Sequence, residues 1–119
     1  MGTETIIALK DASEGLMYPS ETDEPFDVIA WPAGPADART AVAENGRMTP
    51  GAKVEVEDAE AFFSGLMDDP GFKKLKEVVE RELSSPVAVR VGDVRIDVYL
   101  IGRTPTGAWA GLHTRSVET

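Results

Sequence analysis

Residues 92–102, Gly-Asp-Val-Arg-Ile-Asp-Val-Tyr-Leu-Ile-Gly, decide the fold that this sequence predicts. In an extended chain, apolar residues at every second position lie on one side: Val94, Ile96, Val98 and Leu100. This alternation is typical of a β-strand. Glycines bound the stretch, and at about 3.3 Å per residue it is roughly 30 Å long. A folded chain of this size has a diameter of ~27 Å, so a strand of this length crosses the whole domain. We therefore expect it to be the central strand, with the rest of the chain packed on or beside it.

The remaining sequence alternates helical and extended patterns. Helices are predicted at residues 4–13, 37–44, 58–67 and 70–83, and further strands at residues 26–31, 53–57, 87–91 and 108–115. Residues 18–25 predict a loop between two prolines that carries three acids in four positions. Helices alternate with strands in the first part of the chain, and a meander of three strands closes it. This order predicts an α+β fold. We expect a three-layer α/β/α sandwich with a mixed, largely antiparallel sheet, in a single domain over residues 1–119.

The charge balance restricts the class of partner. Twelve Lys and Arg residues against 21 Asp and Glu residues give a net charge of −9. Direct binding to nucleic acid is disfavoured, since phosphate contacts need a cationic face. Two interpretations stay open: the acidity serves solubility alone, or it is directed at a basic protein, for example one that itself binds nucleic acid.

The sequence has no cysteine, so it forms neither a disulfide nor a thiolate metal site. No apolar run approaches the ~20 residues of a membrane span. The first residues lack the basic and apolar regions of a secretory signal, and Ile6 stands where a myristoylation signal needs Ser or Thr. We therefore expect a cytoplasmic protein.

A search for catalytic motifs gives no candidate. His113 is the only histidine, and without a cysteine or a second histidine a zinc site would need three carboxylates. We expect a surface or packing role for His113. Nucleophile-elbow, phosphate-loop and zinc-protease motifs are absent from the sequence. We predict no enzymatic activity and no cofactor.

Three blocks of residues resemble a known family, and the shortest of them runs from Val56 to Phe62-Phe63-Ser64. The C-terminal block reads Gly92-x-Val94-x-Ile96-Asp97-Val98-Tyr99-x-Ile101-Gly102, then Thr104-Pro105-x-Gly107-x-x-Ala110-Gly111, Thr114 and Val117-Glu118-Thr119. The N-terminal block reads Leu9-Lys10-x-Ala12-Ser13-x-Gly15-Leu16, Ser20-Glu21 and Pro25-Phe26-x-Val28, with Trp31. With these residues the chain resembles the nuclease A inhibitors, small acidic intracellular proteins that block a sugar-nonspecific, magnesium-dependent endonuclease.

The resemblance implies a PR-1-like α/β/α sandwich and inhibition by occlusion of the nuclease active site, by a monomer. It also implies that Glu21 and the C-terminal carboxylate of Thr119 meet the nuclease near its catalytic magnesium, a metal that only the partner holds. Hard carboxylate oxygens suit such a cation. Around these two residues, the expected partner-binding set of the acidic loop and the chain end is Glu21, Thr22, Asp23, Glu24, Glu118 and Thr119.

One departure from the family affects the partner more than the fold. Residues 64–71 are short where the inhibitor carries a longer acidic segment with a tryptophan, so contacts from there are lost or replaced. The alternative function is an acidic protein-binding module of the same fold with a different basic partner. A small enzyme that uses surface carboxylates is a third and weaker hypothesis.

Overall fold

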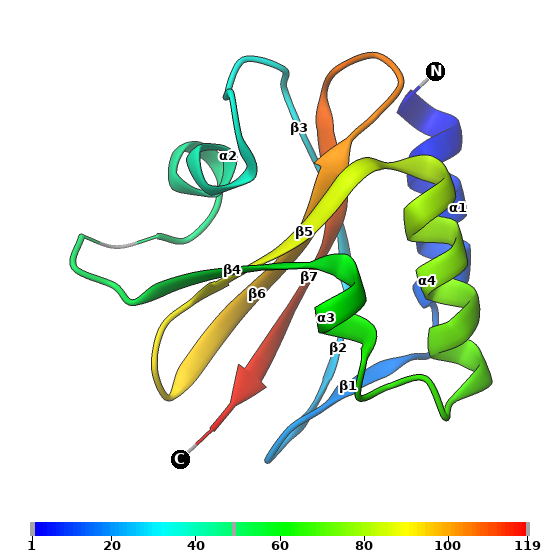
Figure 1. The fold of residues 1–119 in the computed structure, drawn as a ribbon, viewed down its shortest axis with the longest axis vertical. Coiled ribbons are helices and arrows are strands. Elements are labelled where there is room, and N and C mark those ends of the chain that lie inside the picture. Colours follow the sequence, from blue (N-terminus) through cyan, green and yellow to red (C-terminus); the bar gives the residue numbers. More distant parts are fainter. Residues whose placement is uncertain (1, 49, 119) are drawn as a thin grey trace.

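The predicted central strand is β6 (Arg95–Arg103), the middle strand of a five-stranded sheet in the computed structural model of this chain (Figure 1). The structure describes residues 2–48 and 50–118, with the backbone alone for residues 2 and 3. In the order β3-β7-β6-β5-β4, the other strands are β3 (Asp27–Trp31), β7 (Trp109–Val117), β5 (Ser84–Val91) and β4 (Val54–Asp58). The fold is α+β, as predicted.

The prediction of a mixed sheet is wrong, because all four pairings of this sheet in the described residues are antiparallel. The connection between β4 and β5 gives the reason. Helix α3 (Ala59–Phe63) and the turns after it lead the chain away, and α4 (Pro70–Glu82) brings it back to the same end of the sheet (Figure 1). Asp58 at the end of β4 therefore pairs with Val87 near the start of β5, and the two strands run in opposite directions.

Apolar residues fill both faces of the central strands. On one face, α1 (Gly2–Ser13), α3 and α4 pack against Val98 and Leu100 through a core that includes Leu9, Phe63 and Leu75. On the other face, α2 (Ala38–Asn45) packs against Val89, Tyr99 and Ile101, among others. This burial on alternate faces is the pattern that the period of two predicts.

Val94 departs from that pattern. The alternation places it with the inward-facing residues, yet its side chain is 50% exposed. It belongs to the turn between β5 and β6, which begins at Gly92 with a φ of 121°, so it precedes the strand rather than facing the core.

Three aspartates set the starts of the helices. Asp37, Asp58 and Asp69 each accept a backbone N–H at 2.8 Å from the first turn of α2, α3 and α4 respectively. These starts agree with the predicted ones. The third helix is shorter than the predicted range of residues 58–67, because the chain forms turns after Phe63.

The acidic loop predicted at residues 18–25 is instead a small hairpin. Strands β1 (Met17–Pro19) and β2 (Asp23–Pro25) pair antiparallel and form a second, two-stranded sheet. Tyr18 of β1 is buried, and its ring stacks on Phe62 at 5.4 Å. This packing holds the hairpin against α3. Within the described residues, no helix is long and apolar enough to cross a membrane.

Candidate functional site

The turn of the small hairpin carries the acids that the sequence singles out. We call residues 20–24 the acidic tip; Glu21, Thr22 and Asp23 in it are exposed and Glu24 is half-buried. The Glu24 carboxylate accepts a hydrogen bond of 2.7 Å from the Thr22 hydroxyl. Figure 1 shows this turn and the end of β7 at the same lower edge of the molecule.

Backbone hydrogen bonds hold the acidic tip against the end of β7. The Glu21 N–H donates to the Val117 carbonyl at 3.1 Å, and the Val117 N–H donates to the Ser20 Oγ at 3.1 Å. The same Ser20 hydroxyl donates to the Thr22 carbonyl at 2.6 Å. Ser20 therefore orders the turn and joins it to the last strand.

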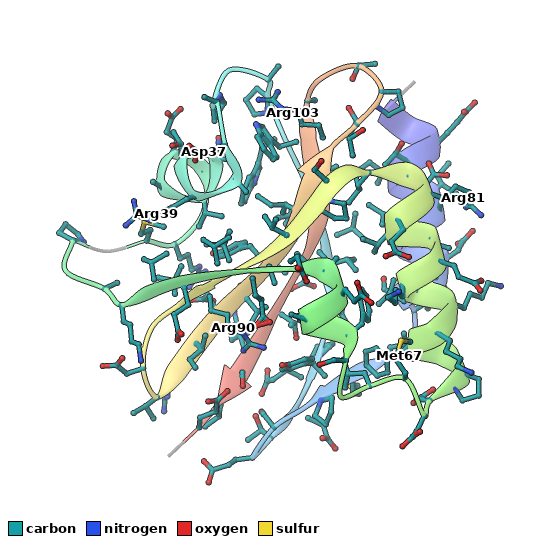
Figure 2. The ribbon with its side chains drawn as sticks, in the orientation of Figure 1. Asp37, Arg39, Met67, Arg81, Arg90 and Arg103 are labelled. Atoms are coloured by element: carbon teal, nitrogen blue, oxygen red, sulfur yellow. The ribbon has the colours of Figure 1, made fainter. Side chains whose placement is uncertain are left out.

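Beneath the acidic tip, Arg90 of β5 contacts three separate segments (Figure 2). Its guanidinium donates to the Tyr18 hydroxyl at 2.9 Å and to the Glu57 carboxylate at 3.2 Å, and lies 4.0 Å from the Glu118 carboxylate. Ser116 donates a further hydrogen bond of 2.7 Å to Glu118. Burial by itself lowers the pKa of Arg90, but its bonds to Tyr18 and the charge of Glu57 outweigh that effect and raise it. This fixed positive charge stabilises the acids around it.

The structure brings most of the predicted partner-binding residues together. Glu21, Thr22, Asp23 and Glu24 form the acidic tip, and Glu118 follows directly after the strand to which the tip is hydrogen-bonded. The Glu118 N–H donates to the Val94 carbonyl at 2.8 Å, which fixes this end of the chain to the β5–β6 turn. Thr119, the sixth predicted residue, lies outside the described residues.

Sequence reasoning missed the residues that support this site: Tyr18, Ser20, Glu57 and Arg90. Glu57 is half-buried against Arg90. A signal was present in β5, where Arg90 interrupts an otherwise apolar run, Val87-Ala88-Val89-Arg90-Val91. A charge on a packed face needs a partner of opposite charge or several hydrogen bonds. The sequence does not give the strand register that places Glu57 opposite it.

His113 has a packing role, which is one of the two roles that the sequence analysis predicts for it. Its side chain is buried, its ring stacks on Tyr99 with 4.6 Å between centroids, and its Nε2 lies 2.8 Å from the Asp97 Oδ1. The Tyr99 hydroxyl accepts the Arg47 backbone N–H at 2.8 Å. These contacts fix the loop after α2 on the sheet.

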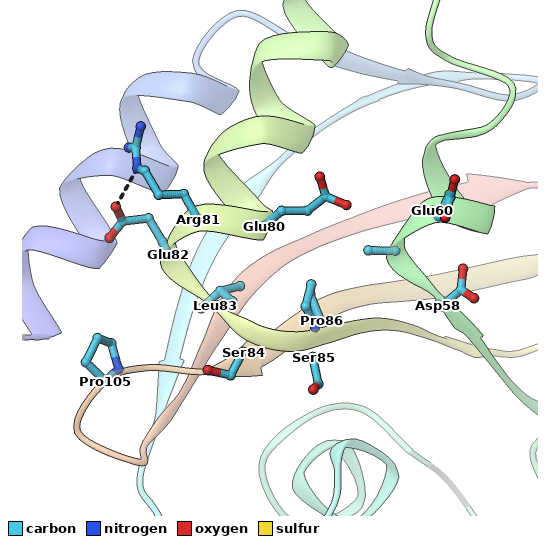
Figure 3. A pocket seen from close by; sticks show the side chains of 11 residues that line it. Asp58, Glu60, Glu80, Arg81, Glu82, Leu83, Ser84, Ser85, Pro86 and Pro105 are labelled. Carbon is cyan, nitrogen blue, oxygen red and sulfur yellow. Dashed lines mark hydrogen bonds and ion pairs between the residues drawn. The ribbon is translucent and has the colours of Figure 1, made fainter.

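A second group of acids lines a groove of about 660 Å³ where β5 begins (Figure 3). It contains Asp58, Glu60, Glu80 and Glu82, together with Arg81, which pairs with Glu82 at 3.0 Å. Because β5 and β7 each pair antiparallel with β6, this groove lies at the end of the sheet opposite to the end of β7. Among the described residues no group of three or more acids or histidines is arranged to hold a metal ion. The groove is an acidic surface.

Comparison with known proteins supports the resemblance seen in the sequence. No curated protein matches this chain. The model of a family described as "Nuclease A inhibitor-like protein" matches residues 3–119, which include the acidic tip and the whole sheet. The chain therefore belongs to the nuclease A inhibitor-like family.

Proposed function

We propose that this protein inhibits a sugar-nonspecific, magnesium-dependent endonuclease by placing the acidic tip in the catalytic cleft. The observation that carries the proposal is the pair of hydrogen bonds between Ser20-Glu21 and Val117, which joins the exposed acids to the end of the last strand. Membership of the nuclease A inhibitor-like family supports an inhibitory role.

Charge explains why such a tip fits a nuclease. A cleft that binds the phosphates of DNA and RNA presents cationic side chains and a metal ion, and carboxylates offer negatively charged oxygens to both. Glu21 and Asp23 are exposed in the turn, and Glu118 is exposed beside it. In this mechanism they occupy the positions of substrate phosphates, and the magnesium ion belongs to the nuclease alone.

The end of the chain adds a further carboxylate to this mechanism. Thr119 is two residues beyond Val117, and two extended residues span at most about 7 Å. In a chain that ends at Thr119, the terminal carboxylate is therefore at most this distance along the chain from Val117, to which the acidic tip is hydrogen-bonded. We propose that it meets the metal of the partner together with Glu21, as in the family that the sequence resembles.

The order of the acidic tip favours tight binding. A flexible loop would lose conformational entropy on entering a cleft, and that loss weakens affinity. Here Ser20 orders the turn, and Tyr18 and Arg90 hold the hairpin beneath it. The acids are therefore already arranged for binding before the nuclease arrives.

The proposal extends to the location, the oligomeric state and the layers of the protein. We propose a cytoplasmic monomer without catalytic activity, folded as one PR-1-like domain of three α/β/α layers over residues 1–119. Core clusters on both faces of the sheet support the three layers.

The experiment is a titration of a purified sugar-nonspecific, magnesium-dependent endonuclease with this protein, followed by digestion of DNA and of RNA. We expect inhibition of both activities at about equimolar inhibitor. Glu21→Lys should weaken inhibition by tenfold or more, whereas Glu77→Lys, on the exposed side of α4, should weaken it much less. Equal inhibition by both variants would contradict the role of the acidic tip.

The short turns after α3 favour a second candidate, a module that binds a different basic protein. Residues 64–68 provide little surface where the inhibitor has a longer acidic segment. Absence of binding to the nuclease in calorimetry, together with undiminished nuclease activity in digestion, would support this candidate over inhibition.

A further inference from the structure

A hollow of about 590 Å³ beside the acidic tip is lined by three arginines, although the protein as a whole is strongly acidic. We call it the arginine cavity; its charged lining residues are Arg47, Arg95, Arg115, Asp97 and Glu24. It is separate from the contacts of Arg90, which lie on the opposite face of the sheet. The proposed inhibition makes no use of these arginines.

The strand register explains why the arginines converge. Arg95 and Asp97 are two positions apart in β6, so their side chains lie on the same face, and Asp97 pairs directly with Arg115 of β7. Arg47 comes from the loop after α2, where its backbone N–H is bound by the Tyr99 hydroxyl of the same face. Two strands and one anchored loop therefore supply the three guanidinium groups.

The pairing of charges leaves a cationic surplus in the cavity. Asp97 is already engaged, since its Oδ1 lies 2.8 Å from the His113 Nε2 and 3.8 Å from the Arg115 Nε. The Glu24 carboxylate accepts from Thr22. Within residues 2–48 and 50–118, neither Arg47 nor Arg95 has a carboxylate within 4.0 Å. Two of the three guanidiniums are therefore available for an anion.

The pKa of the Tyr99 hydroxyl is influenced by several of these charged groups, which shows that they lie close to one another. Burial is the largest effect on its hydroxyl and raises its pKa, and the charge of Asp97 acts in the same direction. Arg47 and Arg115 act in the opposite direction. Charged groups from the loop after α2, from β6 and from β7 therefore all act on the single hydroxyl oxygen of Tyr99.

We propose that the arginine cavity binds the phosphate group of a small molecule. Guanidinium groups present planar forks of N–H donors that match the oxygens of a phosphate, and several of them together bind it more strongly than point charges do. A hollow of this size is in the range of small-ligand sites and has room for a group attached to the phosphate. Asp97 orients Arg115 and is not itself a ligand. This proposal goes beyond the proposed inhibition of a nuclease: it uses the arginines, although the cavity and the acidic tip share Thr22 and Glu24.

Isothermal titration calorimetry of the full chain tests the proposal with three probes at matched ionic strength: inorganic phosphate, pyrophosphate and adenosine monophosphate. We expect saturable binding at one site. Arg95→Gln and Arg115→Gln should each weaken it at least fivefold. Arg39→Gln is the matched control, because Arg39 is an exposed arginine of α2 outside the cavity, and it should leave binding unchanged. Melting temperatures compare the folding of all variants.

The three probes distinguish the source of the phosphate. Tighter binding of adenosine monophosphate than of inorganic phosphate would support the site and assign it to nucleotides, and the reverse order would assign it to free phosphate or pyrophosphate. Absence of saturable binding by all three would overturn the proposal. Binding that Arg95→Gln and Arg115→Gln leave intact in folded protein would also overturn it.

Discussion

At the scale of single residues, Ser20 connects two parts of the candidate site. Its hydroxyl accepts the Val117 N–H and donates to the Thr22 carbonyl, so one oxygen connects the turn with the last strand. Arg90 has the corresponding role beneath the hairpin. Small and buried polar groups therefore set the geometry, while the exposed acids supply the charge.

Replacement of Ser20 tests that division of roles. Ser20→Ala removes these two hydrogen bonds and a third, from the Thr22 N–H at 3.4 Å, each worth about 0.5–1.5 kcal/mol, and frees the acidic tip to move. We expect weaker inhibition of the nuclease with all acids still present. The control is Ser64→Ala, since Ser64 also donates a hydrogen bond to a backbone carbonyl, at 2.8 Å, but far along the chain from the tip. Inhibition curves that coincide for the two variants would contradict the ordering role of Ser20.

The raised pKa of Tyr99 leads us to expect a loss of stability at alkaline pH. Burial raises its pKa, so the folded state favours the neutral phenol. The stabilisation is fully present below the unfolded value of about 10 and is lost as pH rises through the raised folded value. We expect the difference in melting temperature between wild type and Tyr99→Phe to decrease from pH 9 to pH 11. A difference that stays constant over this range would show that the phenol does not ionise on unfolding.

At the scale of elements, sequence patterns predict what depends on neighbours along the chain. The period of two identifies β6, and Asp37, Asp58 and Asp69 mark the starts of three helices. The hairpin β1–β2 was not predicted, because its short strands contain prolines and lack apolar alternation. Its formation depends instead on contacts with Phe62 and Arg90, distant in sequence.

The candidate site shows the same division. The acids of the tip could be predicted as partner-binding residues because they resemble a family and lie in one short segment. The contacts of Arg90 with Tyr18, Glu57 and Glu118 could not, since each depends on strand order and register. The antiparallel direction of β4 depends likewise on the path of two helices, which local patterns do not give.

The packing of β6 gives a prediction for stability. Val98 is 1% exposed in the core between the sheet and the helices α1 and α4, so Val98→Ala should lower the free energy of unfolding by about 1–3 kcal/mol. Val94 lies four residues earlier in the sequence, but its side chain is 50% exposed. Val94→Ala should therefore change the free energy of unfolding by less than about 0.5 kcal/mol. Urea denaturation measures both. Equal effects would mean that burial does not distinguish these two valines.

The end of β7 gives a prediction about the terminal carboxylate. Adding a few residues after Thr119 converts that carboxylate to an amide and puts bulk beside the acidic tip. We expect at least tenfold weaker inhibition, about 1.4 kcal/mol, with little change in melting temperature. The same residues added before Met1 should have no effect on inhibition. If both extended proteins inhibit as well as the unmodified chain, the terminal carboxylate has no part in the mechanism.

At the scale of the whole molecule, opposite charges lie next to each other within a net charge of −9. The acidic tip and the arginine cavity share Thr22 and Glu24, so an acidic and a cationic surface adjoin at one end of the sheet. The acidic groove lies at the other end. Under the proposed function, the net charge of the molecule would attract a basic nuclease, and the local acids would determine which face it meets.

Salt separates these two contributions. Long-range attraction accelerates association and is screened over a Debye length of about 8 Å at ~0.15 M salt, whereas close contacts in a formed complex are screened much less. We expect the association rate with the nuclease to fall steeply between ~0.05 and ~0.5 M sodium chloride, with a smaller change in the dissociation rate. Surface plasmon resonance measures both rates. Glu77→Lys and Glu21→Lys reduce the net charge equally, so both should slow association, but Glu21→Lys alone should accelerate dissociation. An association rate that is independent of salt would mean that the acidity serves solubility and not the encounter with a partner.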